Sequence, residues 1–542
     1  MSFYITITGR RQVLFLALAL FASFVMGYML AQLEGRDNHV AMLSQGNINT
    51  RVCLEKWRKA EIHKRFEKEA NVKQPLKKVT GPRKILLDCG ANVASTVNLF
   101  RETYPDAKDY IIHSFEIDAG LAPYFAYYQD KGHTLHCPVG VADKDGNMTA
   151  FNEGVWFPGK VNMGLDMQWG GGSLFVSGKE GVDKQDGGKR KLSRHDVIPT
   201  VDLSQWIQRN VNKEDYVIFK LDVEGAEYGI LRKMLKDGTF EWIDKFYGEY
   251  HPTQPTGETE KEKKRITDAV AKEITDIISW SAETKEFQDF DKVNSPTILT
   301  DTPGSKGQTL DSCGVVDKMT TVSIVIEVGM NAKRARKLIA TIAAYPIDVH
   351  LTLFIYGDFA EEHPDLVKEW STKYEIGIRC DGPMSSGNWE LQYSNAIRLS
   401  IVSAERRLSD IGLQAHYILP PGVNKVVSDV VTKRKLRLIQ PRTTFPPKGK
   451  QLTSRNYHKF RDVEKVPKAL RMINDGLAKS GGILSLDSDF PDNNMISVFL
   501  LDYLYQTSGH EVVKLECAPG THVRPFTLLI FCLYGLILAI VE

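Results

Sequence analysis

The sequence predicts an α/β protein organised around a doubly wound, mostly parallel sheet. Residues 85–87 form a short apolar run that ends in a turn with Gly90, and a helical pattern starts at Ala94. Two later apolar runs, residues 110–115 and 216–221, end in acidic turns. A buried strand that leads through a glycine-bearing turn into a helix places backbone N–H groups at the carboxyl edge of a sheet, where nucleotide-like cofactors bind.

Acidic residues follow the predicted strands. Glu116 ends the second apolar run, 26 residues after Gly90, roughly where a doubly wound fold has the carboxylate that binds a ribose. Asp143 follows a third apolar segment, and Asp222 and Glu224 follow a fourth. We expect these acids to meet at one edge of the sheet. One glycine is not a dinucleotide fingerprint, so a purely structural strand, turn and helix is the alternative.

These motifs resemble the FkbM-type S-adenosylmethionine-dependent methyltransferases. The resemblance covers about residues 83–291 and is carried by residues 87–92, 115–116 and 142–143 and, most specifically, by residues 220–227. It implies a class I methyltransferase fold with S-adenosylmethionine as the cofactor. Nicotinamide enzymes are the competing interpretation, but the single-glycine turn and the acidic run argue against them.

The resemblance also implies a cofactor site. Its expected residues are Asp88, Gly90 and Asn92 on the methionine side, Glu116 at the ribose, Asp143 at the adenine edge, and Asp222.

Methyl transfer to a hydroxyl needs the acceptor oxygen in line with the sulfonium methyl and a base within hydrogen-bond reach. The candidate catalytic residues are His251, Asp222 and Glu224, and Glu227 is expected to cap or pack. An imidazole titrates near neutral pH, which suits a base, although a lone histidine at a strand end can equally be structural. A divalent metal between Asp222 and neighbouring acids is the alternative, but no ligand cluster with metal spacing supports it, so we expect no metal.

Two long apolar segments predict a membrane setting. Residues 13–33 carry no charge and can span a bilayer core of about 30 Å at about 1.5 Å per residue. Arg10 and Arg11 precede them, so the positive-inside rule predicts a type II protein with residues 1–12 in the cytosol and a lumenal catalytic domain, as in the Golgi. Residues 526–541 are marginal for a span and could instead be a removed tail or lie outside the folded product.

Composition bounds the remaining choices. A chain of 542 residues predicts several domains. Its 69 Lys and Arg balance 67 Asp and Glu, so the charge predicts no nucleic-acid partner. Residues 34–82 form a charged stem, which we interpret as a solvated helical spacer. Seven cysteines without a CxxC spacing argue against structural zinc.

The rest of the chain divides into a methyltransferase domain at residues 83–292, a linker at 293–319 and a second domain at 320–517. Within the first domain, residues 152–196 are rich in glycine and contain Trp156 among other aromatics. This segment is either a lid that faces the substrate or an ordinary surface loop.

The second domain resembles the polysaccharide deacetylases in the order of its predicted strands, which implies a deacetylase-like α/β barrel. That family holds its metal with one aspartate and two histidines, and the matching positions here are Val328, Arg379 and Pro383. None of them ligates a divalent cation as Asp or His does. Glu327 stands at the position of the base. We therefore expect an inactive domain, kept for carbohydrate contact or for shaping the first site.

The sequence thus predicts a membrane-anchored S-adenosylmethionine-dependent O-methyltransferase that acts on a glycan hydroxyl in the secretory pathway. One alternative is a non-catalytic, membrane-anchored carbohydrate-binding protein in which both domains are relics. The retained carboxylates of Asp88, Glu116, Asp222 and Glu224 argue against it. A second alternative is a methyltransferase that acts on a lipid or a small molecule.

Overall fold

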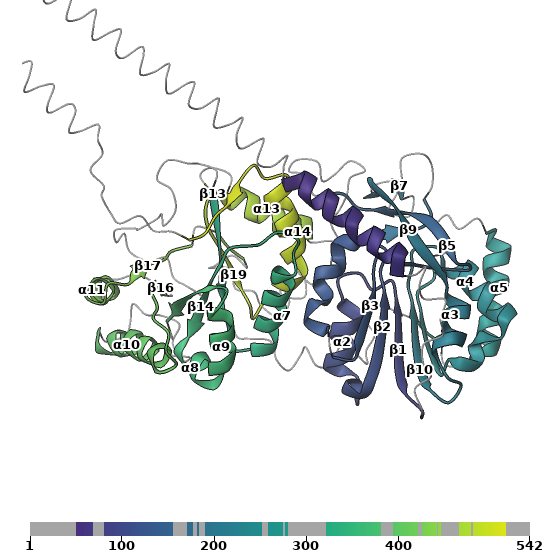
Figure 1. Cartoon of the computed structure of the whole chain (residues 1–542), viewed down its shortest axis with the longest axis horizontal. Helices are drawn as coiled ribbons and strands as arrows, with labels where there is room; N and C mark the ends of the chain where they lie inside the picture. Colours follow the sequence, from purple (N-terminus) through teal and green to yellow (C-terminus); the bar gives the residue numbers. More distant parts are fainter. Residues whose placement is uncertain are drawn as a thin grey trace, which may run out of the picture.

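The computed structural model shows two α/β units side by side (Figure 1). It describes residues 50–68, 81–129, 131–155, 171–176, 182–183, 190–251, 258–274, 277–279, 321–380, 394–420, 425–441, 443–445, 466–477, 481–490 and 492–515.

The first unit contains the predicted parallel sheet. Its six strands run in the order β12-β11-β10-β1-β2-β3, and all neighbours pair in parallel. The strands are β1 (Lys84–Cys89), β2 (Tyr110–Phe115), β3 (His133–His136), β10 (Tyr216–Leu221), β11 (Lys245–Gly248) and β12 (Ile277–Ser279). The helices are α2 (Ser95–Thr103), η1 (Ala107–Asp109), η2 (Ala119–Tyr128), α3 (Leu203–Asn210), α4 (Glu227–Asp237), η3 (Thr239–Trp242) and α5 (Glu260–Glu273).

Helices cover both faces of this sheet, as a doubly wound fold requires. Alternate residues of a strand point to opposite faces. Leu86 of β1 belongs to a buried cluster with α2 and η2, whereas Ile85 and Leu87 belong to a cluster with α3, α4 and α5. The predicted helix start at Asp202 is confirmed, because its side chain accepts a hydrogen bond from the backbone N–H of Gln205 at 3.0 Å.

A smaller sheet adjoins the first one. It contains β4 (Gly140–Ala142), β9 (Arg194–Asp202), β5 (Gly146–Asn152) and β6 (Gly172–Ser173), and a separate pair is formed by β7 (Val182–Asp183) and β8 (Arg190–Lys191). The segment predicted as a glycine-rich loop is therefore partly built of short strands.

The charged stem is helical at residues 50–68, as expected, but it is not a solvated spacer. Leu54 is buried in the cluster that contains α2, and Arg65 is also buried. The Arg65 guanidinium lies 3.0 Å from Nδ1 of His136. Arg58 lies 3.3 Å from the Asp196 carboxylate. These side chains recur at helical spacing, so one face of this charged helix packs on the first domain.

The second unit contains another parallel sheet, in the order β17-β16-β15-β14-β13-β19-β18, with β20 paired to β13. Its strands are β13 (Thr321–Glu327), β14 (Leu351–Tyr356), β15 (Glu375–Arg379), β16 (Tyr417–Leu419), β17 (Arg437–Leu438), β18 (Thr443–Phe445), β19 (Gly482–Asp487) and β20 (Glu511–Val512). The helices are α7 (Ala332–Ala343), α8 (Gly357–Glu362), α9 (Pro364–Ser371), α10 (Ser394–Asp410), α11 (Lys425–Lys433), α13 (Val466–Leu477) and α14 (Asp492–Gln506).

The expected barrel is not closed within the described part of the chain. The end strands β17 and β18 have only two and three residues, and they do not pair with each other. With so few backbone groups to pair, the sheet stays open at these two edges.

The two units share one hydrophobic cluster. Helix α7 and helix α14 of the second unit pack against η2 of the first. The Tyr124 hydroxyl of η2 donates a hydrogen bond to the Met495 carbonyl of α14, and Nζ of Lys337 donates to Oδ1 of Asn98 at 2.6 Å. Because η2 follows β2 and the adjacent Glu116, the second unit supports the segment next to that acid.

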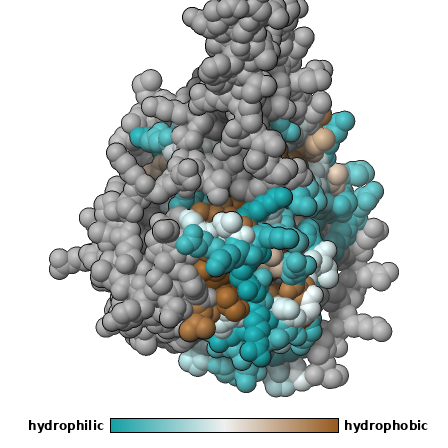
Figure 2. Space-filling model, turned by 90° about the vertical axis from the view of Figure 1, so that its left-hand side faces the viewer, coloured by the Kyte–Doolittle hydropathy of each residue, from teal (hydrophilic) through white to brown (hydrophobic). Residues whose placement is uncertain are grey.

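Figure 2 views the molecule from the end that carries the second unit. The described surface there is mainly hydrophilic, with apolar residues gathered in a few places. Leu399 of α10 is 69% exposed.

Among the residues that the structure describes, no helix combines the length and the apolar character that crossing a membrane requires. The predicted anchor at residues 13–33, the linker at 293–319 and the segment at 526–541 lie outside the described residues.

The turn after β1 requires a glycine at position 90, which can be tested by substitution. This residue has φ +83°, and a Cβ there would lie 1.7 Å from the Asp222 carbonyl oxygen. We expect Gly90→Ala to lower the free energy of unfolding by more than about 3 kcal/mol, because it adds a backbone clash to the left-handed strain. Chemical denaturation monitored by circular dichroism measures this.

Gly238 provides the matched control, because it has φ +67° but a Cβ added there would meet no atom within 4 Å. Gly238→Ala should lower the free energy of unfolding by only about 1 to 2 kcal/mol, because it adds left-handed strain without a clash. Equal losses of unfolding free energy in the two variants would show that the close approach of the turns after β1 and β10 does not contribute to stability.

Candidate functional site

A pocket lies at the carboxyl edge of the first sheet. Its described lining residues are Gly90, Asn92, Phe115, Glu116, Ile117, Val139, Val141, Gly171, Gly172, Leu174, Asp222, Val223 and Glu224. They come from the ends of β1, β2 and β10 and from the smaller sheet. The pocket is therefore polar on the sheet side and largely apolar on the other.

The turn after β1 is fixed by its neighbours. The backbone N–H groups of Gly90 and Ala91 donate hydrogen bonds to the Phe115 carbonyl at 3.1 and 3.0 Å. Asn92 has φ +49° and donates its backbone N–H to Oε2 of Glu116 at 2.7 Å. The turn and the acid after β2 thus hold each other in place at the pocket.

Glu116 is held at both carboxylate oxygens. Its Oε1 accepts a hydrogen bond from the Asp118 backbone N–H at 2.8 Å, in addition to the Asn92 contact. The residue is 5% exposed. Burial raises the pKa of Glu116 to about 7, although its backbone hydrogen bonds act in the opposite direction. A small change of environment therefore decides whether this carboxyl is ionised at neutral pH.

Lys220 is a buried cation beneath the pocket. Its Nζ lies 3.1 Å from Oδ2 of Asp222 and 3.7 Å from Oδ1 of Asp88, and it donates a hydrogen bond to the Gly90 carbonyl at 2.7 Å. Burial acts to lower the pKa of Lys220, but the charges of Asp222 and Asp88 outweigh it and raise that pKa. The lysine therefore stays charged and connects β10 with the end of β1.

Asp88 lies below the pocket and not in it. It is fully buried and accepts a hydrogen bond from the Ser114 hydroxyl at 3.3 Å, and burial raises its pKa. It is not among the described residues that line the pocket. The last residues of a strand alternate between faces, and Asp88 points into the protein, so its role in the structure is to hold Lys220.

Glu227 organises the turn after β10. Its carboxylate accepts hydrogen bonds from the backbone N–H groups of Val223 and Gly225, both at 2.9 Å. The same carboxylate lies 2.8 Å from Nδ1 of His251. Glu227 is fully buried. The prediction that Glu227 caps or packs is confirmed, and it also orients the imidazole.

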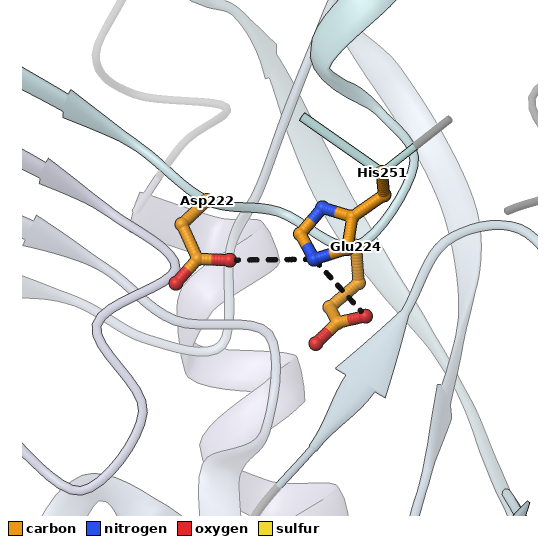
Figure 3. A group of neighbouring side chains, drawn as sticks. All are labelled: Asp222, Glu224 and His251. Carbon is orange, nitrogen blue, oxygen red and sulfur yellow. Dashed lines mark ion pairs between the residues drawn. The ribbon is translucent and has the colours of Figure 1, made fainter. Parts of the chain in front are cut away.

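His251 faces two carboxylates of the pocket. Figure 3 shows its Nε2 directed at Asp222 and Glu224, with distances of 3.9 Å to Oδ1 and 3.7 Å to Oε2. One ligand atom from each of the three residues lies within 4.8 Å of the others. Although burial acts to lower it, the pKa of His251 is raised to about 10 by the hydrogen bond to Glu227 and by the surrounding carboxylates.

The structure brings together six of the eight sequence-predicted residues and leaves Asp88 and Asp143 outside the pocket. Gly90, Asn92, Glu116, Asp222 and Glu224 line the pocket, and His251 adjoins the last two.

Asp143, expected at the adenine edge, is not among the described lining residues; it lies 3.8 Å from the Arg232 guanidinium. It follows β4, which belongs to the smaller sheet, so its position is not set by the edge of the parallel sheet. Val141 of the same strand lines the pocket.

Part of the glycine-rich segment reaches the pocket. Gly171, Gly172 and Leu174 line it, and the Ser173 hydroxyl donates a hydrogen bond to the Glu224 carbonyl at 2.6 Å. Trp156 lies outside the described residues. The described part of this segment therefore faces the site.

Two features of the pocket were not predicted from the sequence. Lys220 received no role from the sequence, although a lysine in an otherwise apolar strand requires a buried anionic partner. The apolar wall of Val139, Val141 and Leu174 had no sequence signal, because short apolar segments look alike whether they face a core or a ligand.

The second sheet carries a different arrangement at its carboxyl edge. The Arg379 guanidinium lies 3.3 Å from Glu327 and 3.2 Å from Asp487, and 4.5 Å from the centre of the Tyr356 ring. Val328 is fully buried, and Pro383 lies outside the described residues. An arginine neutralises these acids, so the described residues do not present a free anionic site for a metal.

Part of the first unit matches a known protein family. Residues 88–282 match the Methyltransferase FkbM domain. The matched range includes every described residue that lines the pocket and ends just beyond β12. None of the curated proteins matches the chain.

Some solved structures show a faint likeness. A CE4 family pseudoenzyme from Bacillus anthracis is 16% identical, with a TM-score of 0.29, over 36% of this chain and 63% of that one. A polysaccharide deacetylase from Bacillus cereus is 16% identical, with a TM-score of 0.29, over 38% of this chain and 94% of that one. The chain thus spans less than two thirds of the pseudoenzyme. Likenesses with TM-scores this low carry no weight for the second unit.

The ion pairs beneath the FkbM-domain pocket lead to a stability prediction. We expect Lys220→Met to lower the free energy of unfolding by about 3 to 5 kcal/mol, because it leaves Asp88 buried without its cation. Lys236→Met, at an exposed position of α4, should change it by less than about 0.5 kcal/mol. Urea denaturation measures both.

The double variant Asp88→Asn with Lys220→Met should be more stable than Lys220→Met alone. It also removes the carboxylate charge of Asp88, which would otherwise be buried without a cation. If Lys220→Met proves no more harmful than Lys236→Met, the buried lysine does not hold the two strand ends together.

Proposed function

We propose that the chain is a membrane-anchored S-adenosylmethionine-dependent O-methyltransferase whose acceptor is a glycan hydroxyl in the secretory pathway. The observation that carries the proposal is the pocket of the FkbM domain, where the turn after β1 and the carboxylate of Glu116 are fixed against each other.

The described residues fit this cofactor. Glu116 would accept hydrogen bonds from the ribose hydroxyls, and the turn at Gly90 and Asn92 would hold the methionine part. The apolar side chains of Val141 and Leu174 would cover the adenine. When bound, S-adenosylmethionine supplies a methyl group on a positively charged sulfur, which the acidic side of the pocket would favour.

The acceptor oxygen must lose a proton as it gains the methyl group. Asp222 and Glu224 line the pocket and can receive that proton. His251 does not line the pocket, but its ring adjoins both carboxylates and can fix their positions. We therefore place Asp222 and Glu224 in the role of the base, with His251 beside them.

The proposed localisation and the proposed acceptor are supported mainly by the sequence. The apolar segment at residues 13–33 and the basic pair before it support a type II anchor with a lumenal domain, for which the Golgi is the natural site. The aromatic, glycine-rich segment that reaches the pocket supports a sugar acceptor. A lipid or small-molecule acceptor at the membrane is the competing proposal.

Calorimetry with S-adenosylmethionine tests the cofactor directly. We expect binding to the wild-type chain that strengthens as the pH rises through about 7, because ribose hydroxyls donate to the ionised form of Glu116 and its proton must leave first. The affinity at pH 6 should be about tenfold lower than at pH 8. Glu116→Ala should abolish binding, and Glu116→Gln should remove this pH dependence.

Glu241→Gln, an exposed position on η3, serves as the control and should bind as the wild type does. Normal cofactor affinity in Glu116→Ala would overturn the proposed site. An absence of heat with the wild-type chain would instead support the non-catalytic, carbohydrate-binding interpretation. Labelled methyl transfer to a glycan panel and to a lipid extract then separates the two classes of acceptor.

A further inference from the structure

We propose that Asp222, Glu224 and His251 form a binding site for a divalent transition-metal ion at the edge of the cofactor pocket. The site takes one carboxylate oxygen from each acid and Nε2 from the imidazole. Two of these three residues also line the pocket, so an ion held here would face whatever the pocket contains.

The three ligand atoms lie within 4.8 Å of one another, which is somewhat wider than the spacing around a bound ion. Ligands at about 2.1 Å from a metal lie roughly 3.0 to 3.4 Å apart. The Nε2 atom lies 3.9 Å from Oδ1 of Asp222 and 3.7 Å from Oε2 of Glu224. Both acids are about one quarter exposed, at 24% and 25%, so small rotations of their side chains would close the remaining gap.

The imidazole gives an observation that is independent of the acids. His251 is 4% exposed, and its Nδ1 is bonded to Glu227. Its Nε2 makes no hydrogen bond to any residue that the structure describes, yet it points between the two carboxylates (Figure 3). Carboxylate oxygens of Asp222, Glu224 and Glu249 lie 3.7 to 3.9 Å from this nitrogen, which is too far for a hydrogen bond and is a spacing that an ion bound between them would close.

Glu227 supplies what a metal-binding histidine requires. A histidine ligand generally donates its second ring N–H to a carboxylate, which fixes the tautomer and the ring orientation. Glu227 does this from a fully buried position, where the backbone N–H groups of Val223 and Gly225 fix its oxygens. Nε2 is thereby directed at Asp222 and Glu224, and a metal ion that binds there would replace the proton of this nitrogen.

The surroundings carry an excess of negative charge. Besides Asp222, Glu224 and Glu227, the carboxylate of Glu249 lies 3.7 Å from Nε2. Lys220 is the described lysine that faces this group, and it holds the second oxygen of Asp222 at 3.1 Å. A divalent cation would offset this charge. In its absence a protonated His251 would do so, and the experiment below distinguishes the two states.

The donor set selects the class of metal. Carboxylates suit Mg²⁺, Ca²⁺ and Mn²⁺, whereas imidazole suits Zn²⁺, Fe²⁺ and their neighbours. Two carboxylates with one buried imidazole therefore favour Mn²⁺ or Fe²⁺ over Mg²⁺, which prefers oxygen ligands. If the proposed methyltransferase function holds, such an ion would bind the acceptor hydroxyl and make its proton easier to remove, and the carboxylate oxygen of Glu224 that does not bind the ion would accept that proton.

Titration of the full chain with Mn²⁺, followed by electron paramagnetic resonance of the free ion, tests the site. We expect one bound Mn²⁺ per chain without any cofactor present. Glu224→Gln should abolish this binding, and Glu227→Gln should weaken it by about 10 to 100-fold, because Glu227 orients the histidine ligand. Asp268→Asn, an exposed acid on α5, should leave it unchanged.

Circular dichroism shows whether each variant is folded, and Mn²⁺ binding by the unaltered chain decides the question even if one variant fails to fold. No bound Mn²⁺ in the wild-type chain, or equal binding by folded Glu224→Gln, overturns the proposal and leaves an imidazolium ion pair. Because this readout needs no S-adenosylmethionine, Mn²⁺ binding without cofactor binding would refute the proposed function alone. Cofactor binding without Mn²⁺ binding would refute the metal site alone.

Discussion

The buried ammonium of Lys220 is the interaction on which the first domain's site depends. It lies between Asp88 on β1 and Asp222 after β10, and it also donates to the Gly90 carbonyl. Without a cation here, two carboxylates would face each other in a medium of low dielectric constant. Since Lys220 fixes the ends of the two central strands, it fixes the turns that carry the pocket. The absence of a side chain at Gly90 then allows these turns to touch.

Backbone groups hold the acids in place once the strand ends are set. Glu116 accepts N–H groups from Asn92 and Asp118, and Glu227 accepts them from Val223 and Gly225. Carboxylates bound in this way cannot turn away when a ligand is absent, so the pocket is organised in advance. The negative charge left over on its inner side matches a cationic ligand, whether a sulfonium or a metal ion.

Much of this arrangement could be predicted from the sequence. The apolar runs, the glycine turn and the acids after each run are local patterns, and parallel strands bring their carboxyl ends together. Glu116 and Asp222 meet at the pocket, as expected, for this reason. Asp143 is not among the described lining residues, because the pairing of β4 with the smaller sheet depends on contacts distant in the chain. The grouping of His251 with Asp222 and Glu224 has no spacing signal, since it joins the ends of β10 and β11 in space. The packing of residues 50–68 on the first domain was not predicted, because the buried face of this helix includes charged side chains as well as Leu54 and so lacks an apolar pattern.

The proposed function requires that the ends of β1 and β2 hold one nucleoside cofactor. A crystal structure of the chain with S-adenosylhomocysteine tests it most directly. The ribose hydroxyls should lie within hydrogen-bond distance of the Glu116 carboxylate, with the sulfur on the side of Asp222 and Glu224. A ligand bound elsewhere, or one in this pocket whose ribose does not touch Glu116, would contradict the account.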